Sequence, residues 1–271
     1  SYLIYFVLRS VVWHEIIKEK GNKLSFKKTT YFWEISEIKR YTPGNVWAFL
    51  SRTQLFTKNN LSTKSIVSSL FNESWLIVLS CLTLSYFYIS TFLNNKGFDN
   101  MLFVLILSLI LTYVASGTLK KKIKLNSFFE KFIDTITPGE NYLNNTKIYL
   151  ISVLSFLMYA LATYFSAVSI FYIDLRDLTQ ILSLFVFSLL IGYLSIITPM
   201  GLGVREGAVT LGLSNYMTVS QAGIVAIFSR IVFIISEVIF LISVFAWEKF
   251  ENSFIKKIET YVSRHKHEVF L

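Results

Sequence analysis

Long apolar runs alternate with short basic segments along this chain, and the lengths of these runs predict membrane-spanning helices. The clearest runs cover residues 73–93, 100–118, 147–173 and 219–246. Each holds about 20 residues or more with almost no charge, the length that a helix needs to cross a hydrocarbon core of about 30 Å. Residues 1–17 form a weaker candidate that Arg9 interrupts, and a strong apolar run at 178–198 ends at Pro199.

The basic residues between the runs predict which connections lie in the cytoplasm. Three segments are rich in lysine and arginine, at 18–28, 120–131 and 249–266. Because these residues collect in cytoplasmic loops, we expect all three segments to be cytoplasmic. The connections at 94–99 and 174–178 carry little net charge, and we expect them to face outward.

The number of crossings agrees with these sides only if two segments enter the membrane and turn back. Residues 29–58 connect a cytoplasmic loop to a helix that must leave from the cytoplasm, so this stretch should dip in from inside. Residues 178–216 should dip in from outside, because the helix after them must end in the cytoplasm. The predicted fold is therefore all-α: a polytopic transmembrane helix bundle with two opposed re-entrant hairpins.

Both predicted hairpins break at similar motifs, which indicates an inverted repeat. The motifs are T-P-G at 42–44 and T-P-M-G at 198–201, and an arginine follows each, at Arg52 and Arg205. Further along, similar helix openings carry Glu73 and Arg230. Broken helices inserted from opposite faces are typical of inverted-repeat transporters, whose substrate site lies near the bilayer midplane. The alternative is a chance recurrence of the dipeptide.

One transmembrane domain, residues 1–248, follows from this arrangement. Its first half covers 1–118 and its second half 147–248, with a basic cytoplasmic linker at 119–146 and a basic cytoplasmic tail at 249–271. The chain begins with Ser1 and its first apolar run is already interrupted, so we expect that a leading segment has been lost or left out.

The composition supports a membrane protein. Of the 271 residues, 54% are apolar and 16% charged, and the mean hydropathy is +0.54, far from the roughly one quarter of charged residues in soluble domains. The net charge of +9 lies in loops beside apolar helices, so the expected partner is anionic membrane lipid and not nucleic acid. We expect an integral protein of the cytoplasmic (plasma) membrane, and the sequence leaves homo-oligomerisation open.

Neither the cysteine nor the histidines predict a cofactor or a metal site. Cys81 is single and lies inside an apolar run, so it can form no disulfide framework. The three histidines, His14, His265 and His267, lack acidic or cysteine partners at ligand spacing. We therefore expect no cofactor and no metal.

The second break is the strongest candidate for a binding site. Non-helical backbone at membrane depth is tolerated only when it is buried in protein or lines a wet cavity. Here Gly201 and Gly203 allow close approach of the backbone, and Arg205 and Glu206 add charge. The amides and the positive end of the next helix would suit a phosphate. The alternative is that the glycines only allow tight packing, with Arg205 paired to Glu206 or to a carbonyl. The spacing and the preceding membrane helix exclude a dinucleotide-binding loop.

Charged residues near the other helix openings extend this candidate site. An ionisable group inside a span is costly and usually faces a partner or a pathway. An ion pair between the halves and a substrate contact are both open for Glu73 and Arg230. The full set of candidate substrate-binding residues is Arg40, Pro43, Gly44, Asn45, Arg52, Glu73, Pro199, Gly201, Gly203, Arg205, Glu206, Arg230 and Glu237.

These motifs resemble a known family of membrane proteins. The segment R-Y-T-P-G-N-V-W at 40–47, followed by Arg52, and P-x-G-x-G-x-R-E-G at 199–207 resemble the lysylphosphatidylglycerol synthase transmembrane region, also called flippase-like, over roughly residues 1–248. The resemblance implies a polytopic helical domain that, in the best-understood members, moves an aminoacylated phospholipid between leaflets. Those members add a soluble synthase domain, whereas a stand-alone transmembrane region is expected here. Asn72-Glu73 departs from the commonest family form, which often has an arginine there.

The leading hypothesis is a lipid flippase-like transporter, not an enzyme. It would move an anionic, aminoacylated or polyprenyl-linked lipid between leaflets, passively or coupled to an ion, because the sequence shows no nucleotide-binding loop. A proton-coupled version would need Glu73, Glu206 or Glu237 to titrate. The alternative is a membrane enzyme or accessory subunit that acts on lipid-linked sugar or phospholipid intermediates, with Glu206 as acid or base and Arg205 as phosphate clamp.

Overall fold

Helices make up all the regular structure in the part of the chain that the computed structural model describes. It describes residues 1–42, 46–93, 100–111, 113, 142–195 and 198–265, and for 93, 142 and 251–265 it describes the backbone alone. The elements are α1 (Tyr2–Glu19), α2 (Phe26–Glu37), η1 (Ile38–Tyr41), α3 (Trp47–Thr57), α4 (Thr63–Leu93), α7 (Tyr142–Val168), η2 (Leu175–Asp177), α8 (Leu178–Leu194), η3 (Pro199–Gly201), α9 (Val204–Leu213) and α10 (Val219–His265). A further apolar helix covers Asn100–Leu111. The all-α prediction is confirmed.

Four of these helical segments are long and apolar enough to cross a bilayer. They are Thr63–Phe92, Leu143–Val168, Leu175–Leu194 and Val219–Phe250. The predicted crossings at 73–93, 147–173 and 219–246 fall on three of them, although α7 ends at Val168. The fourth, along α8, was expected to be the inward arm of the second hairpin. The predicted crossing at 100–118 is described as far as residue 111 and at 113, and its helix there is shorter than a span.

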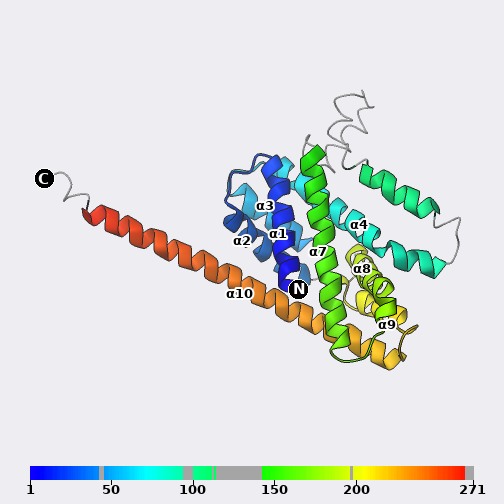
Figure 1. Cartoon of the computed structure of the whole chain (residues 1–271). Coiled ribbons are helices and arrows are strands. Elements are labelled where there is room, and N and C mark those ends of the chain that lie inside the picture. Colours follow the sequence, from blue (N-terminus) through cyan, green and yellow to red (C-terminus); the bar gives the residue numbers. More distant parts are fainter. Residues whose placement is uncertain (43–45, 94–99, 112, 114–141, 196–197, 266–271) are drawn as a thin grey trace, which may run out of the picture.

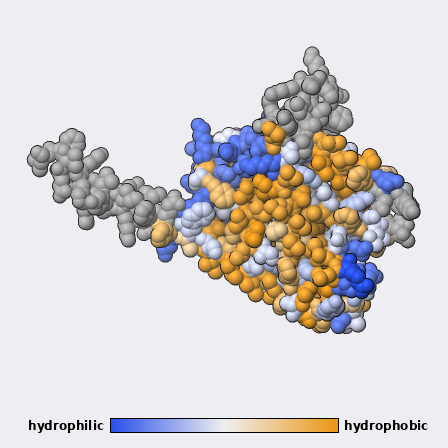
Figure 2. Space-filling model, viewed as in Figure 1, coloured by the Kyte–Doolittle hydropathy of each residue, from blue (hydrophilic) through white to orange (hydrophobic). Residues whose placement is uncertain are grey.

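The helices pack as a bundle from which one end of α10 projects (Figure 1). Helices α1 and α7 lie side by side, and α10 crosses them obliquely. Figure 2 shows a broad apolar face over these helices. The exposed apolar side chains of α10 include Ile227, Ile231, Ile235 and Ile242. Large contiguous apolar surface marks contact with lipid or a partner, which is the surface that a membrane helix needs.

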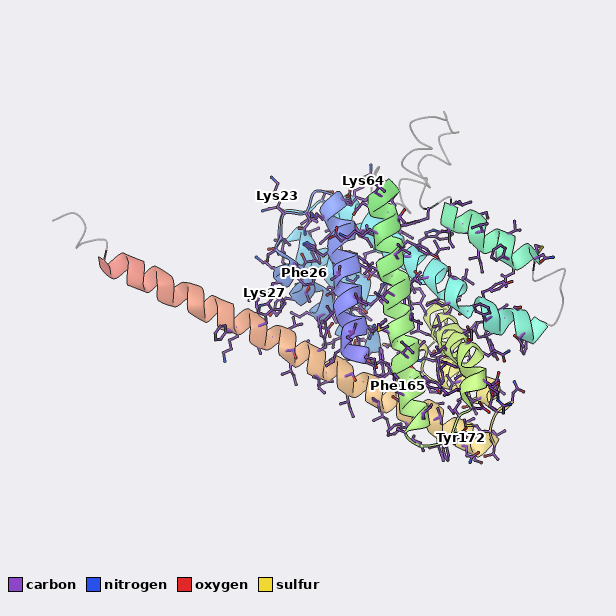
Figure 3. The ribbon with its side chains drawn as sticks, in the orientation of Figure 1. Lys23, Phe26, Lys27, Lys64, Phe165 and Tyr172 are labelled. Atoms are coloured by element: carbon purple, nitrogen blue, oxygen red, sulfur yellow. The ribbon has the colours of Figure 1, made fainter. Side chains whose placement is uncertain are left out.

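The basic segment after α1 and the far part of α10 lie at the same end of the bundle. Lys27 Nζ lies 3.7 Å from Glu248 Oε2, which joins the start of α2 to α10. Figure 3 places Lys23 and Lys64 together at this end and Tyr172 at the opposite end. This arrangement agrees with the predicted grouping of the first and third basic segments, whereas the second, 120–131, lies outside the described residues. The membrane side that they face stays a prediction.

The first predicted hairpin is a pair of short helices, α2 and α3, that pack on each other. Ser25 starts α2 because its side chain accepts a hydrogen bond from the backbone amide of Lys28. The rings of Phe32 and Phe56 meet edge to face at 5.5 Å, and Arg52 Nε donates to Ser36 Oγ at 2.9 Å. The chain therefore returns along itself, and entry of this pair into a membrane stays a prediction.

The second predicted hairpin combines α8 with η3 and α9. The hydroxyl of Tyr216, just after α9, donates to Gln180 Oε1 near the start of α8 at 2.6 Å. The chain thus comes back to the end from which α8 started. The two breaks also meet, because η1 and η3 are in contact. The inverted repeat and the membrane entry of this segment stay predictions.

An aromatic cluster holds the centre of the bundle together. Tyr2, Tyr5 and Phe6 of α1 pack against Tyr159 of α7 and Phe233 of α10, with ring centroids 5.3–6.1 Å apart. Tilted and edge-to-face aromatic pairs stabilise a core beyond the burial of their area. Tyr5, Phe6 and Phe233 of this cluster line the cavity described next.

Candidate functional site

A cavity of about 470 Å³ lies between the helices, beside both breaks. Its charged lining residues are Arg9, Glu37, Arg40, Arg52, Glu73, Arg205 and Arg230. Phe156 of α7 also lines it and lies roughly 20 Å from either end of that helix, at 1.5 Å of rise per residue. The cavity is therefore at mid-height of a helix long enough to cross a membrane.

One side of the cavity holds a buried cluster around Glu73 of α4. Its Oε1 accepts from Arg9 Nη2 at 2.8 Å and from Trp33 Nε1 at 3.2 Å. Its Oε2 accepts from Arg52 Nη1. Arg52 also donates to Glu37 and lies 4.5 Å over the ring of Trp13. Every arm of the Arg52 guanidinium thus has a partner, so this arginine is bound within the protein.

A second group of contacts ties η1 to α10. Arg40 donates to Glu37 Oε2 at 2.7 Å and to Glu237 Oε1 at 2.6 Å. Tyr41 donates to the other oxygen of Glu237 at 2.5 Å. Together with the Glu73 cluster, these contacts form one network in which three arginines meet three glutamates. Charge-assisted hydrogen bonds of this kind are roughly twice as strong as neutral ones, and they fix η1 next to the cavity.

Arg205, from the second half of the chain, has a different environment. Its side chain is buried and lines the cavity, with 5% of the residue exposed. Its guanidinium carbon lies 4.9 Å from the ring centre of Tyr159 and 5.2 Å from that of Phe233. None of the described residues gives Arg205 a carboxylate partner or a side-chain hydrogen bond. The aromatic rings hold this cation in place by cation–π attraction without neutralising it.

Arg230 of α10 is a second cation with unused donors. Its Nη2 donates to the carbonyl of Met200 at 3.3 Å, and its Nε lies 3.6 Å from Glu206 Oε1. Its Nη1 is buried and has no hydrogen-bond partner among the described residues. The expected alternative pairing of Arg205 with Glu206 is not what the structure has, because Glu206 faces Arg230. Nor does Arg230 pair with Glu73, which binds Arg9 and Arg52.

The two glycines of the second break, Gly201 and Gly203, differ in their surroundings. A Cβ on Gly201 would lie 2.5 Å from the Cα of Gly192, so close packing of η3 on α8 requires glycine, and its φ is +66°. Gly203 has φ +84° and open space around it. The amide of Gly201 donates to the carbonyl of Thr198 and that of Gly203 donates to Glu206 Oε2. Both amides are thus used inside the protein, so the arginines of the lining are the cationic donors that the cavity offers to an anion.

The structure brings most of the candidate residues from both halves to this one cavity. Arg40, Arg52, Glu73, Arg205 and Arg230 line it. Glu206 and Glu237 lie behind lining arginines, and Pro199 begins η3. Pro43, Gly44 and Asn45 lie outside the described residues. Within the described part of the chain, no group of three or more histidine, cysteine or acidic residues could hold a metal ion.

Sequence patterns alone did not select several residues of this site. Arg9 interrupts an apolar run, which signals a buried partner, but nothing in the sequence names Glu73 as that partner. Glu37 lies near the first break, and only the fold shows that it joins Arg40 to Arg52. Tyr159 and Phe233 lie inside apolar spans, where no pattern separates a ring that carries a cation from one that faces lipid.

These features define a helical membrane protein with a buried, arginine-lined cavity. Residues 1–241 match the family model of the lysylphosphatidylglycerol synthase TM region, so the chain belongs to this family. The resemblance seen in the two motifs is thereby confirmed, and with it an integral membrane protein related to lipid handling. The chain matched no curated protein and no solved structure.

Proposed function

We propose that this protein binds the anionic headgroup of a lipid in the arginine-lined cavity and moves that lipid between the two leaflets. The observation that carries the proposal is Arg205, a buried cation that lines the cavity and has no carboxylate partner among the described residues. Burying an unpaired charge is costly. An anionic headgroup would supply the missing partner.

The arrangement of the two arginines suits a phosphate. Arg205 and Arg230 come from neighbouring elements, α9 and α10, and both line the cavity. A guanidinium group presents its donors in a planar fork that matches phosphate oxygens in a bidentate way. The free Nη1 of Arg230 adds a donor beside Arg205. One phosphate bound between them is the simplest ligand for these donors.

The carboxylates near the cavity favour a headgroup without an amine. Glu37, Glu73 and Glu237 each give both oxygens to arginine, tryptophan or tyrosine donors. Glu206 accepts from the Gly203 amide and faces Arg230. An ammonium group would have to displace a partner of Glu37, Glu73 or Glu237, or compete with Arg230 for Glu206 Oε1. Among the headgroups considered from the sequence, a plain phosphate or a polyprenyl-linked phosphate therefore fits better than an aminoacylated one.

The acyl chains need a route from the cavity to the lipid. Val46, Phe49 and Leu194 line the cavity and are also exposed on the protein surface. Apolar side chains that reach both the cavity and the outside give hydrocarbon chains a favourable contact. We propose that the headgroup enters the cavity while the chains stay in the bilayer along these residues.

The proposed mechanism uses the two breaks as opposed gates. In this scheme α2–α3 and α8–α9 are re-entrant hairpins of an inverted repeat, in a cytoplasmic membrane with the C-terminus in the cytoplasm. Contact between η1 and η3 beside the cavity supports this scheme, because a movement of one break would displace the other. Rocking of one repeat against the other around a fixed site is the general pattern for such proteins.

The test is leaflet exchange of fluorescent phosphatidylglycerol in vesicles that contain the purified protein. We expect Arg205→Ala to slow exchange about tenfold or more, because a hydrogen bond to a charged group contributes about 1.5–3 kcal/mol. Arg205→Lys should give an intermediate rate, since it keeps the charge and loses the fork. Arg176→Ala is the matched control, since Arg176 is exposed and pairs with Asp174.

Three further results decide between the proposals. Equal exchange by the wild type and Arg205→Ala would remove Arg205 from the binding site. Faster exchange of lysyl-phosphatidylglycerol than of phosphatidylglycerol would contradict the preference for a headgroup without an amine. If neither of these lipids nor a polyprenyl phosphate is exchanged, and the protein instead converts a lipid-linked substrate to product, the enzyme hypothesis replaces transport.

A further inference from the structure

Glu34, in α2, is a fully buried carboxyl group that the proposed binding site does not use. Its exposed fraction is 0%, and neither of its oxygens has a hydrogen-bond partner among the described residues. It lies one helical turn before Glu37, a residue that lines the cavity. A buried carboxylate without a partner carries a large desolvation cost, and the usual outcome is that the group takes up a proton.

Charged groups on the elements around α2 influence whether Glu34 keeps a proton. Glu237 of α10 and Glu37 of α2 act on Glu34 as anions, and Arg40 of η1 and Arg52 of α3 act as cations. On α1, Arg9 is bound to Glu73 and His14 lies against the ring of Phe26. At the start of α2, Lys27 lies near Glu248. The cations nearest to Glu34 are thus already committed to other carboxylates.

The charge balance of the network makes Glu34 the surplus carboxyl group. Arg9, Arg40 and Arg52 are matched by the carboxylates of Glu37, Glu73 and Glu237 through the contacts described above. Arg230 faces Glu206, and Arg205 has no carboxylate. Five arginines therefore face four paired carboxylates. With Glu34 neutral, the region carries one unbalanced positive charge, and with Glu34 ionised it carries none.

We propose that Glu34 is a proton-binding site whose occupancy is linked to headgroup binding at Arg205, so that a proton and an anionic lipid are bound and released together. The inference rests on the proposed function. A proton on Glu34 leaves the site with a net positive charge that attracts the anion. Loss of that proton to water restores a carboxylate, removes the net charge and weakens the attraction. By thermodynamic linkage, the bound lipid raises the affinity of Glu34 for its proton by the same factor as the proton raises the affinity for the lipid.

Glu34 replaces the three residues that the sequence suggested for proton coupling. Both oxygens of Glu73 and both oxygens of Glu237 already accept hydrogen bonds from arginine, tryptophan or tyrosine donors. Glu206 accepts from the Gly203 amide at the start of α9 and faces Arg230. Glu34 has no such contact.

The first experiment detects the proton without any transport. Infrared spectra of the purified full chain are recorded across a pH series, and the carbonyl band of a protonated carboxylic acid is followed. We expect a band at neutral pH that is lost in Glu34→Gln and kept in Glu19→Gln, a glutamate at the exposed end of α1. If Glu34→Gln does not fold, Glu34→Met, which also has no titrating group, takes its place. A spectrum without this band, or a band that both variants keep, would overturn the proton site.

The second experiment measures the linkage with phosphatidylglycerol as the probe. Affinity of the wild type should fall as the pH rises through the titration of Glu34, by at most about tenfold for each pH unit, because one proton is involved. Glu34→Gln should stay in the high-affinity form at every pH, and Glu19→Gln should follow the wild type. In vesicles, a gradient of one pH unit should then support up to about a tenfold lipid asymmetry with the wild type and none with Glu34→Gln.

The outcomes separate this inference from the proposed function. Lipid exchange that Arg205→Ala abolishes, together with binding that does not depend on pH, would leave transport in place and overturn the linkage. A carboxylic acid band at Glu34 without binding or exchange of any anionic lipid would keep the proton site, reject its link to a lipid and reject the proposed function. Equal pH dependence in the wild type and Glu34→Gln would also overturn the linkage.

Discussion

Arg52 and Arg205 each follow a T-P motif in the sequence, but their contacts differ. Arg52 donates to Ser36, Glu37 and Glu73 and lies on Trp13. Arg205 has aromatic neighbours and no carboxylate among the described residues. A residue with every donor used holds the fold together, whereas a residue with free donors is available to a ligand. Stability and binding are therefore expected to respond differently to loss of these two side chains.

Loss of the Glu73 charge should destabilise the protein strongly. Glu73→Gln would leave Arg9 and Arg52 buried with fewer anionic partners, and removing one partner of a buried pair costs about 3–5 kcal/mol. Thermal unfolding in detergent, followed by tryptophan fluorescence, should show a clearly lower midpoint. Glu19→Gln at the exposed end of α1 should stay within about 0.5 kcal/mol of the wild type. A Glu73→Gln protein as stable as the wild type would contradict the role given to this cluster.

Which charged residues are buried in the fold could be predicted from the sequence better than the partners of those residues. Arg205 and Arg230 stood out because a charge in or beside an apolar span is costly and therefore conspicuous. The partners of other buried arginines lie far away along the chain, as in the bonds from Arg9 to Glu73 and from Arg40 to Glu237, and spacing carries no information on such contacts. Glu34 and Glu37 are one helical turn apart and look alike in the sequence, yet only Glu37 has cationic partners.

Helices α4, α7 and α10 could be predicted because each has a long stretch with almost no charge. The short helices α2 and α3 could not be bounded, since Glu37 and Arg52 face the buried network instead of solvent. Helix α8 is long enough to cross a bilayer by itself, so its length alone does not separate a span from one arm of a hairpin. The prediction that α8 pairs with α9 in a hairpin was based on the expected sides of the loops and not on the length of α8.

Substitutions of the two glycines with positive φ should differ in effect. Gly201→Ala would place a Cβ 2.5 Å from the backbone of Gly192, so η3 and α8 would have to separate. We expect this variant to lose stability by several kcal/mol, because backbone cannot move aside as a side chain can. Gly203→Ala meets open space and should cost only the left-handed backbone conformation, about 1–2 kcal/mol. Chemical or thermal unfolding of the two variants in detergent checks the order. Equal losses would mean that η3 does not need to lie against Gly192.

At the scale of the whole molecule, the two ends of the bundle should face opposite sides of the membrane. Lys64 and Tyr172 lie at opposite ends of the bundle and are exposed. In a Cys81→Ala background, which removes the buried native thiol, a membrane-impermeant thiol reagent added to intact cells should label Tyr172→Cys and not Lys64→Cys.

Both of these cysteines should react after the membrane is dissolved in detergent, which controls for accessibility. Labelling of both positions from the same side of intact cells would contradict the orientation. Labelling of Lys64→Cys alone in intact cells would mean the opposite orientation, with the basic end outside.

The packing of Arg205 on aromatic rings also has a practical consequence for purification of the protein. A guanidinium held on Tyr159 and Phe233 without a counter-charge is a ready receptor for any amphiphile with an anionic head. Detergents with sulfate or carboxylate heads, such as bile salts, should occupy it and compete with phosphatidylglycerol, whereas maltoside detergents should leave it empty. The choice of solubilising agent therefore determines whether a ligand screen finds the cavity available or already blocked.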